Sequence, residues 1–195
     1  MKAAVSEFSD NGFKGASVNR LATTLGISKG SIFQYFRNKN GLFLFVFEHA
    51  ILTVKDYLKR VRSETEDLDV FERIRETLLA GVAFVRKNPK VFNVYLRIVH
   101  ERSIPMRGEL IHAVRALSLE YLHSMLEEGQ KRGELRPDVN LKRTAFFLDA
   151  ILDRFLQAYN VPHLDGGLDV FHAAEDAVNQ WADELVELLR SGLGK

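Results

Sequence analysis

Residues 18–37, VNRLATTLGISKGSIFQYFR, constrain the fold of this chain more than any other segment. They read as two short helices separated by a turn that contains Gly26. Ala22 is small where two crossing helices must touch, and Gly26 can take the positive φ that the turn requires. Ser28 is placed to cap the second helix by accepting a hydrogen bond from a backbone N–H. This pattern predicts a helix-turn-helix motif, whose second helix enters the major groove of DNA.

The apolar and aromatic side chains of this motif are expected to face inward and hold the crossing angle: Leu21, Leu25, Ile27, Ile32 and Tyr35. The remaining side chains of the second helix are expected to face DNA. Gln34 has the donor and acceptor for a bidentate contact to adenine, and Lys29 can reach guanine or phosphate. Gly30 lets the backbone approach the duplex closely.

Hydroxyl and ammonium groups around the second helix are suited to phosphate contacts, which position a protein without specifying sequence. Ser31, Tyr35 and Lys39 are the candidates. The full set of predicted DNA-binding residues is Ser17, Ser28, Lys29, Gly30, Ser31, Phe33, Gln34, Tyr35 and Lys39.

Charge is unevenly distributed along the chain, although the formal net charge is only +1. Residues 1–40 carry six basic residues against two acidic ones, and residues 141–195 carry five against nine. A basic N-terminal region is attracted to phosphates, while an acidic C-terminal region avoids them. The double-stranded DNA partner is therefore expected at the N-terminal end.

Helical spacing of apolar residues runs through the rest of the chain, and no strictly alternating run bounded by turn residues predicts a strand. Gly133 is expected to end a helix in the left-handed conformation. The four prolines stand where the helical pattern breaks: Pro89, Pro105, Pro137 and Pro162. Nine helices are expected, three short ones before residue 37 and six over residues 40–62, 67–87, 89–101, 105–132, 139–160 and 168–191. The predicted fold is all-α, with an N-terminal three-helix helix-turn-helix domain (1–45) and a larger helical ligand-binding and dimerisation domain (46–195).

The two helices predicted over 139–160 and 168–191 are apolar over a wide arc; Val170, Phe171 and Ala174 belong to the second of them. Such helices must be covered on more than one side. An ordinary core pair and a pair that also buries a face against a second copy explain the pattern equally well. In a homodimer the same patch of each copy would meet across a twofold axis. The predicted dimer residues are Ile151, Phe155, Val178 and Trp181.

Several classes of function are disfavoured by what the sequence lacks. It has no cysteine, so disulfides, thiolate metal sites and cysteine nucleophiles are excluded. It has no apolar run of the roughly 18 residues that a membrane span needs and no signal peptide, so no membrane association and a cytoplasmic location are expected. It also has no phosphate-binding glycine loop, HExxH or GxSxG pattern. The chain is therefore expected to be neither an enzyme nor a cofactor-binding protein.

A helical-bundle metalloenzyme of the di-iron carboxylate type is the alternative function. The Glu-x-x-His motif of such bundles occurs twice, at Glu109–His112 and Glu120–His123. Both copies fall on one predicted helix, roughly 16 Å apart along its axis, whereas a shared site needs them on facing helices. No metal site is therefore predicted.

The segment from Ala3 to Leu42 resembles the tetracycline-repressor (TetR) type regulators. The matching residues are Ala4, Phe8, Gly12, Phe13, Ser17, Leu21, Ala22, Gly26, Ile27, Ser28, Gly30, Ser31, Ile32, Tyr35, Phe36, Lys39 and Leu42. The resemblance implies an all-helical homodimer that binds a pseudo-palindromic operator. It also implies that a small-molecule inducer binds the C-terminal domain, changes the separation of the two recognition helices and releases the DNA.

Two features depart from the family's pattern. Phe33 stands where the family usually has tyrosine, so one hydroxyl for a phosphate contact is missing. The sequence also begins inside the expected first helix. Either its start is truncated, or the protein makes fewer contacts to the DNA backbone at that edge.

The inducer pocket implied by the resemblance would open between the central helices. Its aromatic and aliphatic candidates favour an apolar or aromatic ligand, and His112 or Arg97 would anchor a polar group. Each candidate would otherwise be an ordinary core residue. The predicted ligand-binding residues are Phe84, Phe92, Tyr95, Ile98, His112, Tyr121 and Phe147.

Overall fold

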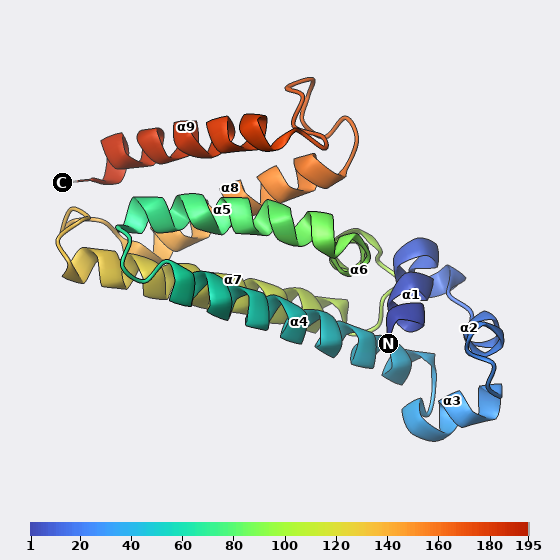
Figure 1. The fold of residues 1–195 in the computed structure, drawn as a ribbon. Coiled ribbons are helices and arrows are strands. Elements are labelled where there is room, and N and C mark those ends of the chain that lie inside the picture. The colour runs from blue at the N-terminus through green and yellow to red at the C-terminus, as the bar shows by residue number, and fades with distance from the viewer. Residues whose placement is uncertain (195) are drawn as a thin grey trace. The chain divides into compact units, whose positions relative to one another are not determined.

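The computed structural model describes residues 1–194, and over them the chain is built from helices (Figure 1). The all-α prediction is confirmed. Within those residues, extended pairing is limited to one isolated antiparallel bridge between Leu135 and Gly194. The helices are α1 (Lys2–Gly15), α2 (Val18–Leu25), α3 (Lys29–Phe36), α4 (Lys39–Glu64), α5 (Val70–Lys87), α6 (Pro89–His100), α7 (Arg107–Lys131), α8 (Leu141–Asn160) and α9 (Glu175–Leu193).

Local chemistry sets many of the helix ends. Ser17, Ser28 and Asn140 precede α2, α3 and α8, and each side chain accepts a hydrogen bond from the backbone N–H three residues further on. Pro89 is the first residue of α6, where its missing N–H costs nothing. Gly133 follows α7 with a φ of 76°, as predicted.

The start of the last helix differs from the prediction, because α9 begins at Glu175 and not near residue 168. The Asp165 carboxylate accepts backbone N–H groups from Gly167, at 3.2 Å, and from Val170, at 2.9 Å, which holds this connection in a turn. Asp169 and His172 take positive φ angles, which an α-helix does not allow. The apolar residues predicted for the first turn of α9 lie instead in the connection: Val170, Phe171 and Ala174.

The helices form two compact units, and α4 and α7 each run from one unit into the other. The first unit comprises residues 1–56 and 88–114, and the second comprises residues 57–87 and the chain from Arg115 onward. The first unit thus contains the whole of the predicted N-terminal domain together with α6 and the beginning of α7. The predicted boundary near residue 45 stays a prediction.

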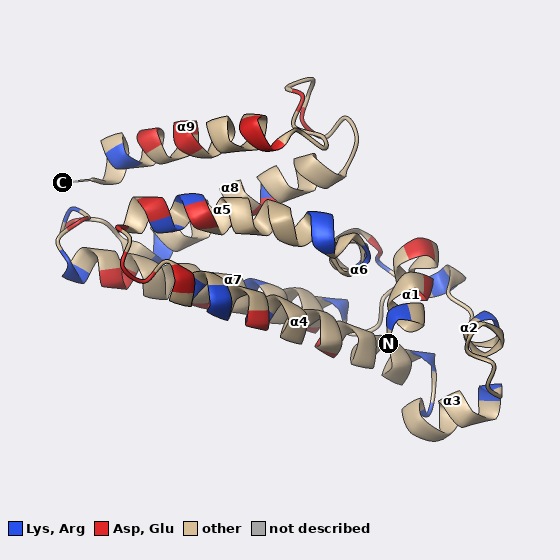
Figure 2. Ribbon diagram, viewed as in Figure 1, with Lys and Arg blue, Asp and Glu red and all other residues tan. Residues whose placement is uncertain are grey.

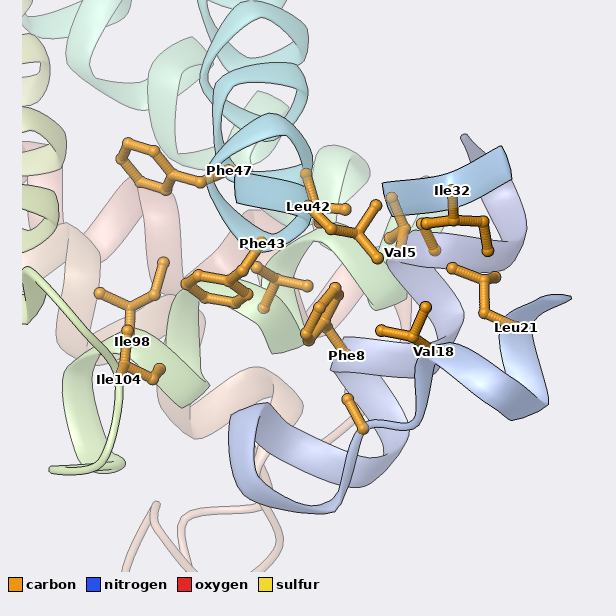
Figure 3. Close-up of a cluster of buried hydrophobic side chains, with 14 of the residues drawn as sticks. Val5, Phe8, Val18, Leu21, Ile32, Leu42, Phe43, Phe47, Ile98 and Ile104 are labelled. Atoms are coloured by element: carbon orange, nitrogen blue, oxygen red, sulfur yellow. The ribbon is translucent and has the colours of Figure 1, made fainter. Parts of the chain in front are cut away.

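Aromatic rings from α1 and α4 form the centre of the first unit (Figure 3). The rings of Phe8 and Phe43 meet edge to face with centroids 5.1 Å apart, and Phe13 meets Phe43 in the same way at 5.4 Å. Ile98 of α6 lies in the same cluster. Truncating a buried phenylalanine such as Phe8 to alanine costs about 3–5 kcal/mol of stability. This core therefore joins the predicted DNA-binding helices to α6.

The second unit is centred on α5, which packs against α8 and α9 (Figure 1). Ile74 and Leu78 of α5, Leu126 of α7, Leu148 of α8 and Ala182 of α9 are almost fully buried there. No helix within residues 1–194 carries a stretch long and apolar enough to cross a membrane.

Candidate nucleic-acid interface

The turn between α2 and α3 has the geometry that the sequence predicts. Gly26 lies in the left-handed region, with φ 65° and ψ 28°, and its N–H is directed at the carbonyls of Ala22 and Thr23. The N–H of Ile27 donates to the Ala22 carbonyl at 3.1 Å. These bonds satisfy carbonyls that the end of α2 leaves without helical partners. The positive φ predicted for Gly26 is confirmed.

The start of α3 is capped by its own serines. The Ser28 hydroxyl accepts the Ser31 N–H at 3.0 Å, and the two hydroxyls lie 2.9 Å apart. The predicted capping role of Ser28 is thus confirmed. Both side chains remain at the exposed N-terminal end of α3, where backbone N–H groups and the helix dipole favour an anion such as phosphate.

An acidic residue that sequence reasoning did not single out joins α1 to α2. The Glu7 carboxylate accepts the Ser17 N–H at 2.7 Å and the Arg20 Nε at 2.9 Å, and it forms an ion pair with Arg20. The hydrogen bond from the Arg20 guanidinium is the main reason why the pKa of Glu7 lies below its ordinary value. The sequence does offer a signal for Glu7, because it is one of only two acidic residues in the basic segment 1–40.

The inward-facing set of the motif is smaller than predicted. Leu21, Ala22 and Ile32 are buried as expected. Leu25 and Ile27 are each 47% exposed and Tyr35 is 82% exposed, so their inward orientation was wrong. The physical reason is length, because two helices of eight residues can cover only a few of each other's side chains, so those beside the turn and at the end of α3 stay open to solvent.

The predicted DNA-facing side of α3 is largely exposed. Gln34 and Tyr35 are open to solvent, as are Lys29 and Gly30. Phe33 departs from that pattern, because it is half-buried against the core of the first unit and its ring lies 5.5 Å from the Lys29 ammonium. Its contribution is therefore partly to packing.

Lys39 has partners within the first unit. Its ammonium donates to the Lys14 carbonyl at 3.1 Å and lies 5.0 Å from the centre of the Phe13 ring. A phosphate contact by Lys39 therefore requires the ammonium to share or leave these partners.

The electrostatic character of the motif comes from a stretch without carboxylates. Residues 11–47 contain five lysines and arginines and no acidic residue. Figure 2 accordingly shows no acidic segment on α2 or α3. The acidic residues before this stretch are paired, Glu7 with Arg20 and Asp10 with Lys90. Positive charge is therefore the dominant charge around α3, which suits a surface that meets phosphates.

The predicted ligand-binding residues are divided between the two units. Phe92 and Ile98 are buried in the first unit, with Tyr95 against Phe92, while His112 is exposed. The set therefore stays a prediction. The members that fall in the second unit are Phe84, Tyr121 and Phe147.

Those three residues have different surroundings in the second unit. Phe84 is buried with its ring 5.2 Å from that of Tyr57. The Tyr121 hydroxyl lies 3.2 Å from that of Thr77, and burial is the main reason why the pKa of Tyr121 is raised. Phe147 is 59% exposed, so within its unit it faces away from the interior.

A cavity of about 410 Å³ lies in the second unit, between the end of α4, one face of α5 and the start of α9. Its lining combines aliphatic side chains, among them Leu79, Ala83 and Val178, with polar and charged ones, among them Glu76, Arg86 and Glu175. None of the predicted ligand-binding residues lines it.

The predicted dimer residues do not all share one exposed surface. Ile151 is exposed on α8, and Phe155 and Trp181 form an edge-to-face pair with centroids 6.3 Å apart. Val178 is only 3% exposed and packs within its own chain, so a second copy cannot contact it as the unit stands. Leu188 of α9 is 74% exposed and was not predicted.

The di-iron alternative finds no geometric basis. Both Glu-x-x-His pairs lie on α7, as predicted, and therefore not on facing helices. Within residues 1–194, no three side chains of the metal-ligating types come close enough together to hold a metal ion.

Taken together, two capped helices, a left-handed glycine turn and an exposed, carboxylate-free second helix define a helix-turn-helix DNA-binding protein. Comparison with known proteins identifies the group. Residues 1–46 match the bacterial regulatory proteins of the tetR family. This match and the relatives described next support a transcriptional regulator of the TetR family, a class of proteins that are not enzymes.

Relatives extend the similarity over the whole chain. The HTH-type transcriptional repressor NicS of Pseudomonas putida is 24% identical over 194 residues, which cover 99% of this chain and 90% of that protein. The fold is shared with a TetR family regulator of Chloroflexus aurantiacus, with a TM-score of 0.70 and 23% identity over 100% of this chain and 91% of that one. It is also shared with the regulator FadR of Bacillus subtilis in complex with stearoyl-CoA, with a TM-score of 0.76 and 19% identity over 98% and 96%.

Proposed function

We propose that this chain is a homodimeric transcriptional repressor that binds a pseudo-palindromic operator and is released from it by a small apolar or aromatic ligand. The observation that carries the proposal is the α2–α3 motif, with its left-handed Gly26 turn and its exposed α3. NicS, which is similar over nearly the whole chain, is a repressor by name. The class of regulator is proposed from this similarity, and the contacts to operator and ligand are proposed from the residues of this chain.

The proposed division of labour on DNA follows from exposure. Gln34 is exposed in the last turn of α3 and is the proposed reader of a base. Tyr35, free of core packing, is the proposed phosphate contact, together with the hydroxyls at the start of α3. Those hydroxyls belong to Ser28 and Ser31. The remaining residues of the set are proposed as contacts to the DNA backbone or as supports: Ser17, Lys29, Gly30, Phe33 and Lys39.

The proposed dimer surface is the exposed apolar face of α8 and α9. Ile151 and Leu188 expose large side chains there, and the Phe155–Trp181 pair lies half-buried beside them. A twofold axis would bury this face against its own copy. Val178 supports the face from inside the chain.

The ligand is proposed to be predominantly apolar. The solved relative FadR was crystallised with stearoyl-CoA, so the fold can house a long acyl chain. In this chain, aromatic and aliphatic side chains dominate the predicted ligand-binding set, and aliphatic side chains line part of the cavity beside α5.

Selection of bound duplexes from a randomised pool tests the proposal. We expect enrichment of a sequence with two inverted half-sites about 10–10.5 base pairs apart, or a multiple of that spacing. Compounds of increasing apolar surface are then screened for release of the best duplex. Failure to enrich any duplex would contradict DNA recognition, and enrichment of a single half-site would contradict the dimer.

A further inference from the structure

Helix α1 is broken at one residue. Gly12 has φ 65° and ψ −179°, which is not helical, so α1 consists of two segments joined at a kink. At such a kink the carbonyls that end the first segment and the N–H groups that begin the second lose their helical partners. Without other partners the kink would be unstable.

Arg97 of α6 and Glu101, the residue directly after this helix, supply the missing partners. Arg97 donates to the Ser9 carbonyl at 3.2 Å and to the Asp10 carbonyl at 3.1 Å, at the end of the first segment. The Glu101 carboxylate accepts the Phe13 N–H at 3.0 Å and the Lys14 N–H at 3.1 Å, at the start of the second. Because positions 97 and 101 are four residues apart, both side chains reach the same side. We call this arrangement the α1 clasp.

The backbone conformation at the kink strongly favours glycine. Its positive φ disfavours any side chain. In addition, a Cβ on Gly12 would lie 2.5 Å from Oε2 of Glu101, so the clasp occupies the space of a side chain. The Ser103 hydroxyl donates to the other carboxylate oxygen at 2.7 Å and fixes its orientation.

Further bonds connect the clasped helix to the DNA-binding motif. Upstream of the kink, Glu7 binds Ser17 and Arg20 at the start of α2. Downstream of it, the Lys14 carbonyl accepts the ammonium of Lys39 at the start of α4. The position of α1 on α6 therefore sets where α2 and α3 are held within the first unit.

We propose that Glu101 and Arg97 are positioning residues for operator recognition, because they lock α1 at its Gly12 kink and thereby fix the recognition helix α3 within the first unit. The inference deepens the proposed function and rests on it. A clasp with only a structural role would contribute to stability but not to the choice of DNA.

The test replaces one acceptor of the clasp. In Glu101→Gln, one carboxylate oxygen becomes an NH₂ group that cannot accept a backbone N–H. The matched control is Glu109→Gln, which neutralises an exposed carboxylate in the first turn of α7 within the same unit. Amide exchange is measured residue by residue. We expect exchange at Phe13 and Lys14 to be about tenfold faster in Glu101→Gln, and unchanged in the control, since hydrogen bonds to a charged acceptor are stronger than those to a neutral one.

The second readout is the preference for half-site spacing. The wild-type chain and both variants are titrated with the duplex selected by the wild type, and with duplexes that have one base pair inserted or removed at the centre. In Glu101→Gln we expect the ratio of the affinities for the selected and the altered spacings to be about tenfold smaller, because α3 is held less firmly. Loss of folded molecules alone would lower the active fraction and leave this preference intact. Ser103→Ala, which removes one donor to the carboxylate, should shift both readouts in the same direction by less.

The outcomes separate the clasp from the proposed function. A wild-type chain that enriches no duplex contradicts DNA recognition itself and the positioning role with it. A wild-type chain that selects a duplex, with a Glu101→Gln variant of unchanged spacing preference, overturns the positioning role and leaves the proposed function standing. If Glu101→Gln does not fold, Ser103→Ala decides by the same two readouts.

Discussion

At the scale of single residues, the motif depends on positions where local chemistry leaves few choices. Gly26 must take a positive φ, and Ser28 must satisfy a backbone N–H at the start of α3. Both requirements act within a few residues, so each can be tested by one substitution that leaves the rest of the chain unchanged.

Gly26→Val should abolish DNA binding while both units stay helical. A Cβ at Gly26 would meet nothing within 4 Å, so the substitution causes no clash. The cost is backbone strain of about 1–2 kcal/mol for a β-branched residue at this φ, which the α2–α3 turn relieves by shifting. Retention of the selected duplex on a gel checks the expectation, with circular dichroism as the measure of folding. Gly26→Asn is the control and should bind nearly normally, because asparagine tolerates the left-handed region. Normal binding by the valine variant would show that the turn does not need this conformation.

Gln34→Ala and Tyr35→Ala should separate base reading from backbone contact. Gln34→Ala is expected to lose about 1–3 kcal/mol of discrimination at one base position. Tyr35→Ala should weaken binding to all duplexes alike, because a phosphate contact carries no sequence information. Titrations against single-base variants of the selected duplex measure both effects. Sequence-selective loss in Tyr35→Ala would reverse the two assignments.

Lys39→Ala should weaken binding to every duplex and lower the slope of log affinity against log salt by about one counterion. It should also loosen the start of α4, since the ammonium bonds to Lys14 in the DNA-free chain. The salt slope distinguishes the two roles. If affinity falls while the slope is unchanged, Lys39 acts only as an internal support.

At the scale of helices, ion pairs and caps decide how neighbouring elements are joined. Glu7 links α1 to α2 and Asp165 shapes the connection before α9, and the pKa of each carboxyl lies below its ordinary value. For Glu7 the leading cause is the hydrogen bond from Arg20, and for Asp165 it is the hydrogen bond from the Gly167 amide.

The link made by Glu7 should depend on pH. Because its pKa is depressed in the folded chain, its stabilising contribution is present above the ordinary value of 4.5 and is lost as the pH falls through the folded value. Glu7→Gln should therefore be less stable than the wild type at neutral pH, and the gap should close below about pH 4.5. Melting temperatures from pH 3 to 8 measure this, with exposed Glu48→Gln as the control. A gap that persists at pH 3 would mean that packing, not charge, joins the helices.

At the scale of the whole molecule, the proposed function depends on a second copy of the chain. In the proposed dimer two recognition helices read two half-sites, and the single chain leaves large apolar side chains exposed on α8 and α9. Ile151→Asp should yield a monomer that no longer binds the selected duplex, because burying an unpaired charge costs several kcal/mol. Sedimentation at micromolar concentration measures the oligomeric state. Leu168→Asp, an exposed apolar position in the α8–α9 connection, is the control and should stay dimeric. A dimeric Ile151→Asp variant would place the interface elsewhere.

The sequence by itself determined the all-α class, the extent of most helices and the α2–α3 motif. These features follow from interactions within a few residues, such as the Ser28 cap and the Gly26 turn, and short-range rules describe such interactions well. The same rules failed for the first turn of α9, where the Asp165 side chain competes with helix formation for backbone N–H groups.

Only the tertiary structure decided which side chains are exposed and which distant residues meet. Tyr35 and Val178 both follow an apolar helical pattern, yet the first is open to solvent and the second is buried. Glu7 and Glu101 read as ordinary surface carboxylates, because their partners lie 10 and 88 residues away along the chain. The helical spacing of apolar residues shows which face of a helix is apolar. It does not record whether another helix covers that face, since coverage depends on contacts between segments that are distant in sequence.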